Sequence, residues 1–201
     1  MKPASLLENN PGEIVLDTSA IVNLNATGYA KTILNSLTHQ VLVPYPVITE
    51  LKRGRDKGHD DAHDMFSLLK VGAALPIRMD QQERSTFIKL VGGHTSVSLG
   101  DGEAATLSLS ENGKRWACID EKKARRISNQ SSSNRLISTL DLLLTNEVER
   151  ALTKLEFENA ILNALEVSLM NVQPSHIAWI VSIIPKDRLK KCVSLPSRYR
   201  F

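Results

Sequence analysis

Four segments of this chain carry carboxylates at points where an apolar stretch gives way to a turn or helix. They are EIVLD ending at Asp17, VPYPVITE ending at Glu50, LGDGE with Asp101 and Glu103, and WACIDE with Asp120 and Glu121. Like charges a few ångströms apart resist joint ionisation, so converging carboxylates require either raised pKa values or a cation that cancels the repulsion. The pattern predicts a metal site.

The elements that must position these acids are short strands alternating with helices. Buried strands are predicted at residues 13–16, 41–43 and 116–119. The first and last end at Asp17 and Asp120, and a helix carrying Glu50 follows the second. Such alternation is typical of a parallel sheet with helices on both faces. Because ligands bind outside the carboxyl ends of parallel strands, acids from distant parts of the chain can share one cleft.

Helix starts are predicted from capping residues. Thr18 or Ser19 is expected to cap the first helix, whose apolar face continues to residue 37 after a break near Gly28. Another helix is expected at residues 81–91, and a turn through Gly100 is expected to start a helix at residues 103–109. N-capping would explain Asp101 structurally, and a first-turn Glu103 is also common as a capping partner.

The organisation predicted from these patterns is a tail at residues 1–11, an α/β domain at residues 12–146, and a helical extension with a basic tail at residues 147–201. Residues 53–64 are expected to form an exposed loop or a frayed helix end. Leucines recur at helical spacing after residue 147. These helices are expected to pack on the core or to offer a surface to a partner.

Length and composition favour a globular protein that can bury a full core. The chain has 201 residues, of which 42% are hydrophobic. No stretch approaches the roughly 18 apolar residues of a membrane span, and MKPASLLENN lacks a secretory pattern. Cys118 and Cys192 are expected to be free structural thiols, which fits a reducing compartment. A cytoplasmic location without membrane contact is therefore expected.

The net charge of +3 is small but unevenly distributed. Six basic residues against one acid follow residue 185. Two other basic clusters, within residues 52–57 and 114–126, lie beside acidic segments. Basic patches around an acidic centre suit a polyanion whose backbone is held while a metal acts on it. The alternative that these are solvated surface charges stays open on sequence alone.

The chain resembles the PIN-domain family of metal-dependent nucleases, most closely its bacterial and archaeal toxin-like branch. The resemblance covers about residues 12–145. It rests on the order and spacing of IVLDTSAIVNL, VPYPVITELKRG, LGDGEAATLSL, ACIDEKKARRIS and STLDLLL. It implies a three-layer α/β/α sandwich with a mainly parallel central sheet, here with a C-terminal helical extension.

By motif position, the resemblance implies that four acids coordinate one or two Mg²⁺ or Mn²⁺ ions and hydrolyse phosphodiester bonds, usually in RNA. These catalytic and metal-binding candidates are Asp17, Glu50, Glu103 and Asp120, with Asp101 as a further metal ligand and Glu121 as an extra acid. Ser19 matches a small hydroxyl residue held near the metal and scissile phosphate. Lys122, Arg125 and Arg126 match basic residues that bind the substrate.

Several alternatives stay open. The chain could be the toxin of a toxin–antitoxin pair or a processing nuclease, and DNA remains an alternative to RNA. The C-terminal helices could bind an antitoxin or another protein, or replace a homodimer contact. A non-catalytic PIN-like module that binds RNA or protein is the rival from another class. An aspartate-based phosphatase would need an acid where Ser19 stands, and no GxGxxG turn supports a nucleotide-binding Rossmann enzyme.

Overall fold

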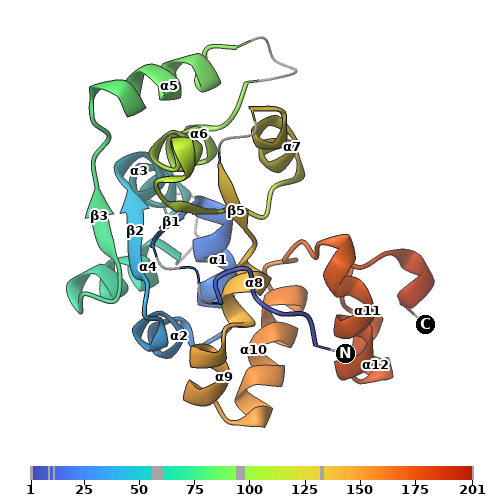
Figure 1. Cartoon of the computed structure of the whole chain (residues 1–201). Coiled ribbons are helices and arrows are strands. Elements are labelled where there is room, and N and C mark those ends of the chain that lie inside the picture. The colour runs from blue at the N-terminus through green and yellow to red at the C-terminus, as the bar shows by residue number, and fades with distance from the viewer. Residues whose placement is uncertain are drawn as a thin grey trace.

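Five short parallel strands form the centre of the part of the chain that the structure describes (Figure 1). The computed structural model describes residues 2–8, 10, 12–55, 61–93, 98–131 and 134–200. The strands are β1 (Glu13–Leu16), β2 (Gln40–Pro44), β3 (Leu75–Ile77), β4 (Trp116–Cys118) and β5 (Arg135–Ile137). They lie in the order β3-β2-β1-β4-β5, and each pair of neighbours is parallel.

Helices connect and cover these strands. Those that alternate with the strands are α1 (Thr18–Ala26), α2 (Ala30–Ser36), α3 (Tyr45–Arg55), α4 (Asp61–Lys70), α5 (Gln81–Val91), α6 (Asp101–Leu109) and α7 (Lys122–Ser131). Those that follow the sheet are α8 (Thr139–Leu143), α9 (Asn146–Ala151), α10 (Lys154–Glu166), α11 (Pro174–Ile183) and α12 (Lys186–Leu189). Single 3₁₀ turns lie at Glu111–Gly113 and Ser197–Tyr199.

The sheet is buried on both faces, which confirms the predicted α/β/α sandwich. Successive side chains of a strand point to opposite faces. Accordingly, Ile14 and Leu16 join a large apolar cluster with residues of α1, α3, α4, α8 and α10. Val15, between them, contacts Leu42 and Leu109 on the other face, where α5, α6 and α7 lie (Figure 1).

The direction of strand addition reverses beside β1. The chain adds β2 and β3 on one side of β1, and then β4 and β5 on the other. Such a switch point opens a crevice at the carboxyl ends of the two central strands. Leu16 pairs with Cys118 in register, and the backbone N–H of Asp17 donates to the Cys118 carbonyl at 3.2 Å. Asp17 and Asp120 therefore follow adjacent strands at the same edge of the sheet.

Several local predictions are wrong in detail. Asp17, not Thr18 or Ser19, is the N-cap of α1, since its carboxylate accepts the backbone N–H of Ala20. Helix α6 begins at Asp101 after the N-cap Gly100, so Asp101 is inside the helix and not its cap. Strands β3 and β5 are absent from the predicted elements. The expected loop at residues 53–64 is helical at both ends, since α3 runs to Arg55 and α4 begins at Asp61. Residues 56–60 lie outside the described residues.

The helices after the sheet are packed on the α/β layers. Ile161 and Leu165 of α10 are fully buried in the same apolar cluster as Ile14 of β1, and α10 packs against α1. Cys118 and Cys192 are free and buried, as expected. Within the described residues, no helix is long and apolar enough to cross a membrane.

Replacing Leu165 by Ala should lower the free energy of unfolding by about 2–5 kcal/mol, because it empties a closed part of the core. Leu155→Ala is the matched control on the same helix. The Leu155 side chain is 67% exposed, so its loss should change the free energy of unfolding by less than about 0.5 kcal/mol. Urea denaturation of both variants measures the difference, and equal small effects would show that α10 is not part of the core.

Candidate functional site

Four carboxylates meet in a cleft of about 260 Å³ at the carboxyl edge of the sheet. Its lining residues are Asp17, Thr18, Ser19, Glu50, Gly100, Glu103 and Glu121. They come from the junction of β1 and the first turn of α1, from α3, from the start of α6 and from the turn after β4. The switch point of the sheet thus brings together acids that are far apart in the sequence.

Asp17 is fixed by the helix that follows it. Its Oδ1 accepts the backbone N–H of Ala20 at 2.7 Å, and the Ser19 hydroxyl lies 3.0 Å from each carboxylate oxygen. The side chain is buried, and this burial raises its pKa well above the usual range. The charges of Asp120 and Glu103 raise the pKa of Asp17 further, while the Ala20 and Ser19 hydrogen bonds lower it.

Glu50 reaches the cleft from α3. The Thr18 hydroxyl donates to its Oε2 at 2.6 Å, which ties α3 to the start of α1. Gly102 of α6 lies directly against this pair. A Cβ atom at Gly102 would come within 2.5 Å of Glu50 Oε2 and 2.8 Å of Thr18 Oγ1. Only glycine lets α6 approach α3 this closely without displacing the carboxylate.

Glu103 caps its own helix and faces the other acids. Its Oε2 accepts the backbone N–H of Gly100 at 3.0 Å. Burial is the largest cause that raises the pKa of Glu103, and the charges of Glu121 and Glu50 raise it further. The Gly100 hydrogen bond and the charge of Lys123 act in the opposite direction. Glu103 therefore stabilises the start of α6 and also supplies a carboxylate to the cleft.

Asp120 lies behind the cleft and is held by three donors. Asn23 Nδ2 donates to its Oδ2 at 2.7 Å, the Thr139 backbone N–H donates to its Oδ1 at 3.0 Å, and the Thr139 hydroxyl donates to Oδ2. Burial raises its pKa, and the Thr139 and Asn23 hydrogen bonds oppose that rise. Asp120 is 3% exposed and is not among the cleft's lining residues, whereas its neighbour Glu121 is.

Asp101 points away from these acids. It is exposed on the first turn of α6 and lines a neighbouring pocket of about 410 Å³, together with Tyr45, Thr49 and residues of β3 and α5. The two pockets are neighbours, since Asp101 follows Gly100, and Thr49 precedes Glu50, of the acidic cleft.

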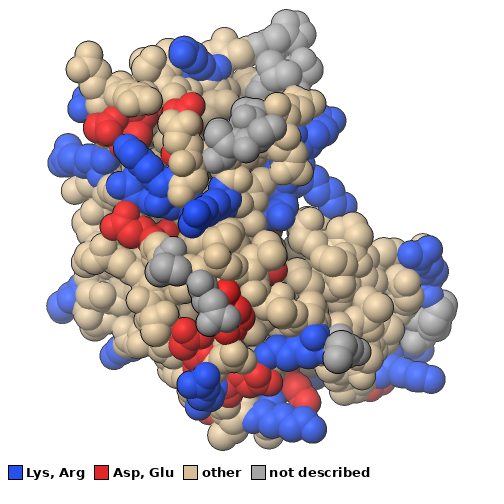
Figure 2. Space-filling model, viewed as in Figure 1, with Lys and Arg blue, Asp and Glu red and all other residues tan. Residues whose placement is uncertain are grey.

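The predicted basic residues Lys122, Arg125 and Arg126 line a different groove, of about 740 Å³. It runs between α7 and the C-terminal helices, where the surface is indented in Figure 2. Arg125 also has a structural contact: its Nη1 donates to the carbonyl oxygens of Ile119 at 2.9 Å and Ile137 at 3.0 Å. It thereby ties together the carboxyl ends of β4 and β5.

Four residues of the site carry no functional prediction from sequence: Thr18 as partner of Glu50, Gly102, Asn23 and Thr139. Gly102 becomes informative once α6 is known to begin at Asp101. A glycine inside a helix costs about 1 kcal/mol relative to alanine, so its presence there indicates a close approach of another element. No local pattern marks Asn23 or Thr139 as partners of Asp120.

The chemistry of the cleft suits a hard divalent cation. Among the described residues, no three acidic, cysteine or histidine side chains are gathered closely enough to form a closed metal cage. Mg²⁺ does not require one, because it binds through one or two carboxylates and keeps several waters. Asp17, Glu50, Glu103 and Glu121 supply oxygen donors whose mutual repulsion a cation would relieve.

Comparison with known protein families identifies the class. A family model described as a PIN domain matches residues 13–184. The chain therefore belongs to the PIN-domain family, whose members are generally nucleases and typically use divalent metal ions. The match continues through α10 and α11, beyond residue 145, where the resemblance carried by the motifs ends. Searches of curated proteins and of solved structures found no match.

Gly102→Ala should weaken metal binding without unfolding the protein. The new Cβ must displace the Glu50 carboxylate from its place beside Thr18, while alanine favours the helix itself. Gly54→Ala is the control, since Gly54 also lies in a helix and a Cβ atom added there would meet nothing within 4 Å. Thermal unfolding with increasing Mn²⁺ should show a smaller rise of the midpoint in Gly102→Ala alone. Equal rises in both variants would contradict the close packing described for Glu50.

Proposed function

We propose that this protein is a metal-dependent endoribonuclease that hydrolyses phosphodiester bonds in RNA. The observation that carries the proposal is the convergence of Asp17, Glu50, Glu103 and Glu121 in one cleft at the switch point of a PIN-domain sheet. Clustered acids destabilise a fold, and the raised pKa values of Asp17 and Glu103 reflect that cost. Groups kept together at such a cost are candidates for a functional site.

The carboxylates of Asp17, Glu50, Glu103 and Glu121 would hold Mg²⁺ or Mn²⁺. When bound, the ion supplies a Lewis acid that makes a bound water more acidic and stabilises charge on the phosphate oxygens. The protein contributes fixed positions for its ligands. Thr18 restrains Glu50, the Gly100 N–H restrains Glu103, and the Ala20 N–H restrains Asp17. Such preorganisation lowers the reorganisation needed during reaction.

Two further groups would orient the substrate. Ser19 lines the cleft with its hydroxyl 3.0 Å from Asp17, so it can turn to donate to a phosphate oxygen beside the acids. Lys122, Arg125 and Arg126 line the groove that lies next to the cleft along the chain. Glu121 in the cleft and Lys122 in the groove are consecutive residues, so a polyanion held in the groove would reach the acids.

Asp17→Asn should reduce the rate of RNA cleavage in Mn²⁺ by about 100-fold or more, since it removes a charge that acts in the transition state. It should not lower the thermal unfolding midpoint. Asparagine is as good an N-cap as aspartate, and the change removes a buried charge that Asp120 and Glu103 disfavour. Gel analysis of end-labelled RNA and a thermal melt measure the two effects.

The control for this experiment is Asp64→Asn, which removes an exposed acid in α4 outside the cleft. Asp64→Asn should cleave RNA at the wild-type rate, and EDTA should abolish cleavage by the wild type and by Asp64→Asn. A single-stranded DNA of the same sequence tests the preference for RNA. Undiminished cleavage by Asp17→Asn would contradict the proposal, and binding of RNA without any cleavage by the wild type would favour a non-catalytic module.

The neighbours Asp120 and Glu121 should respond differently to loss of charge. Asp120→Asn places a donor where Asn23 and Thr139 already donate, so it should lower the free energy of unfolding by about 1–3 kcal/mol as well as reduce activity. Glu121→Gln should reduce activity by about 10- to 100-fold at unchanged stability, because Glu121 faces the open cleft. Urea denaturation and cleavage rates separate the two roles. Equal stability losses would contradict the distinction.

A further inference from the structure

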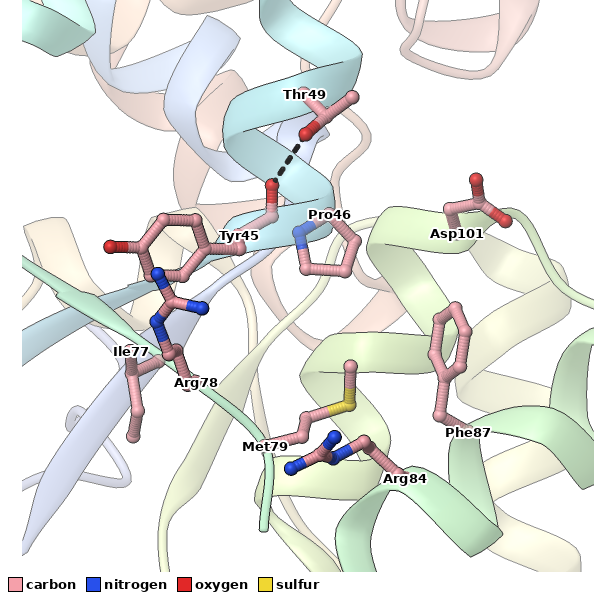
Figure 3. A pocket seen from close by; sticks show the side chains of 9 residues that line it. All are labelled: Tyr45, Pro46, Thr49, Ile77, Arg78, Met79, Arg84, Phe87 and Asp101. Atoms are coloured by element: carbon pink, nitrogen blue, oxygen red, sulfur yellow. Dashed lines mark hydrogen bonds between the residues drawn. The ribbon is translucent and has the colours of Figure 1, made fainter. Parts of the chain in front are cut away.

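The pocket beside the acidic cleft has a composition that the nuclease chemistry does not require (Figure 3). It is about 410 Å³ in volume and is formed by the start of α3, the end of β3, α5 and the start of α6. Its lining combines aromatic rings, two arginines and one carboxylate: Tyr45, Pro46, Thr49, Ile77, Arg78, Met79, Arg84, Phe87 and Asp101. We propose that this pocket binds an unpaired nucleobase of the RNA, next to the bond that is cleaved.

Flat surfaces define two walls of the pocket. Tyr45 is 41% exposed as a residue, and the Arg78 guanidinium lies 4.4 Å from the centroid of its ring. Figure 3 shows this stacked pair on one side of Pro46 and the Phe87 ring on the other. Aromatic rings and guanidinium planes are the groups on which proteins stack the bases of single strands. The floor of the pocket is held by core packing, because Met79 and Phe87 pack against the apolar clusters on the α6 face of the sheet.

The charges of the pocket suit one nucleotide of a polyanion. Arg84 lies at its edge, where its Nε donates to the Asp80 carbonyl at 3.3 Å, and Figure 3 shows its guanidinium beside Met79. Arg84 and Arg78 can meet backbone phosphates on either side of a bound base. In Figure 3 the Asp101 carboxylate stands above the Phe87 ring. A base stacked on Phe87 would offer its edge to Asp101, which accepts hydrogen bonds from an exocyclic amino group such as that of adenine. Uracil offers only its N3–H, which lies between two carbonyl oxygens that repel a carboxylate.

The inference that the bound base lies next to the cleaved bond rests on the proposed function. Thr49 and Glu50 are consecutive in α3 and belong to the pocket and the cleft respectively, and Asp101 directly follows Gly100 of the cleft. A base in the pocket would therefore belong to a nucleotide adjacent to the phosphate at the acids. The pocket would select the cleavage position by base identity, with adenine favoured over uracil, and Asp101 would contact the base.

The test compares binding of three fluorescent single strands of equal length: oligoadenylate, oligouridylate and a strand of abasic ribose phosphates. Anisotropy is measured in EDTA with the full chain. Wild type should bind oligoadenylate about 10-fold more tightly than the abasic strand, in line with the contribution of one stacked base. In Phe87→Leu, which keeps an apolar group against the core, this ratio should shrink to about 3-fold or less. Ile88→Ala, which alters a 67% exposed neighbour on α5, should keep the wild-type ratio.

Asp101→Ala should reduce the preference for adenine over uracil, because alanine offers the base no acceptor. Loss of the negative charge should strengthen binding of all strands alike, so the ratio of the two affinities is compared. Equal base discrimination by wild type and Phe87→Leu would overturn the pocket proposal. Cleavage in Mn²⁺ separates the two proposals. RNA cleavage whose rate and sites are unaffected by Phe87→Leu would overturn the base pocket and leave the nuclease intact. Base-dependent binding that Phe87 controls, without any cleavage, would overturn the nuclease and leave the pocket intact.

Discussion

Electrostatic repulsion among carboxylates is the constraint on which the functional edge of this protein depends. Burial raises the pKa values of Asp17, Asp120 and Glu103, and neighbouring acids raise those of Asp17 and Glu103 further. An unconstrained chain would separate these charges. The fold keeps them together because each acid also accepts hydrogen bonds from the elements that carry it or lie beside it. The site is therefore held by contacts that are at the same time part of the secondary structure.

The capping contacts show how this double use works. Asp17 begins α1 and Glu103 satisfies a free N–H at the start of α6, so removing either side chain would disturb a helix end as well as the cleft. Asp120 has the largest structural role of these acids, since three donors hold its carboxylate. With Asn23 and Thr139 as donors, it joins α1, β4 and α8 behind the cleft and leaves Glu121 to face solvent. One acid of the pair thus supports the edge of the sheet while its neighbour is exposed to a ligand.

The sequence predicts the parallel α/β architecture, the strands that end at Asp17 and Asp120, and a shared acidic edge. Those features depend on local patterns: apolar runs bounded by turn residues, and acids at their ends. It does not predict the edge strands β3 and β5, because three residues are too few to show a clear alternation, and β3 also contains Pro76. The predicted helix at LGDGE starts two residues late, and that error hides the fact that Asp101 and Glu103 point to different sides of α6. The partners of Asp120 come from positions 97 and 19 residues away, which no local pattern can reveal.

The C-terminal helices are bound to the site by polar as well as apolar contacts. Asn171, in the segment between α10 and α11, donates through its side chain to the backbone carbonyl of Asp120 at 2.9 Å. The same segment forms the wall of the basic groove opposite Lys122 and Arg126. Because α10 is buried against α1, whose first turn is capped by Asp17, a shift of these helices would reach both the groove and the acids. The region after residue 146 is thus packed against elements that carry both the groove and the acids.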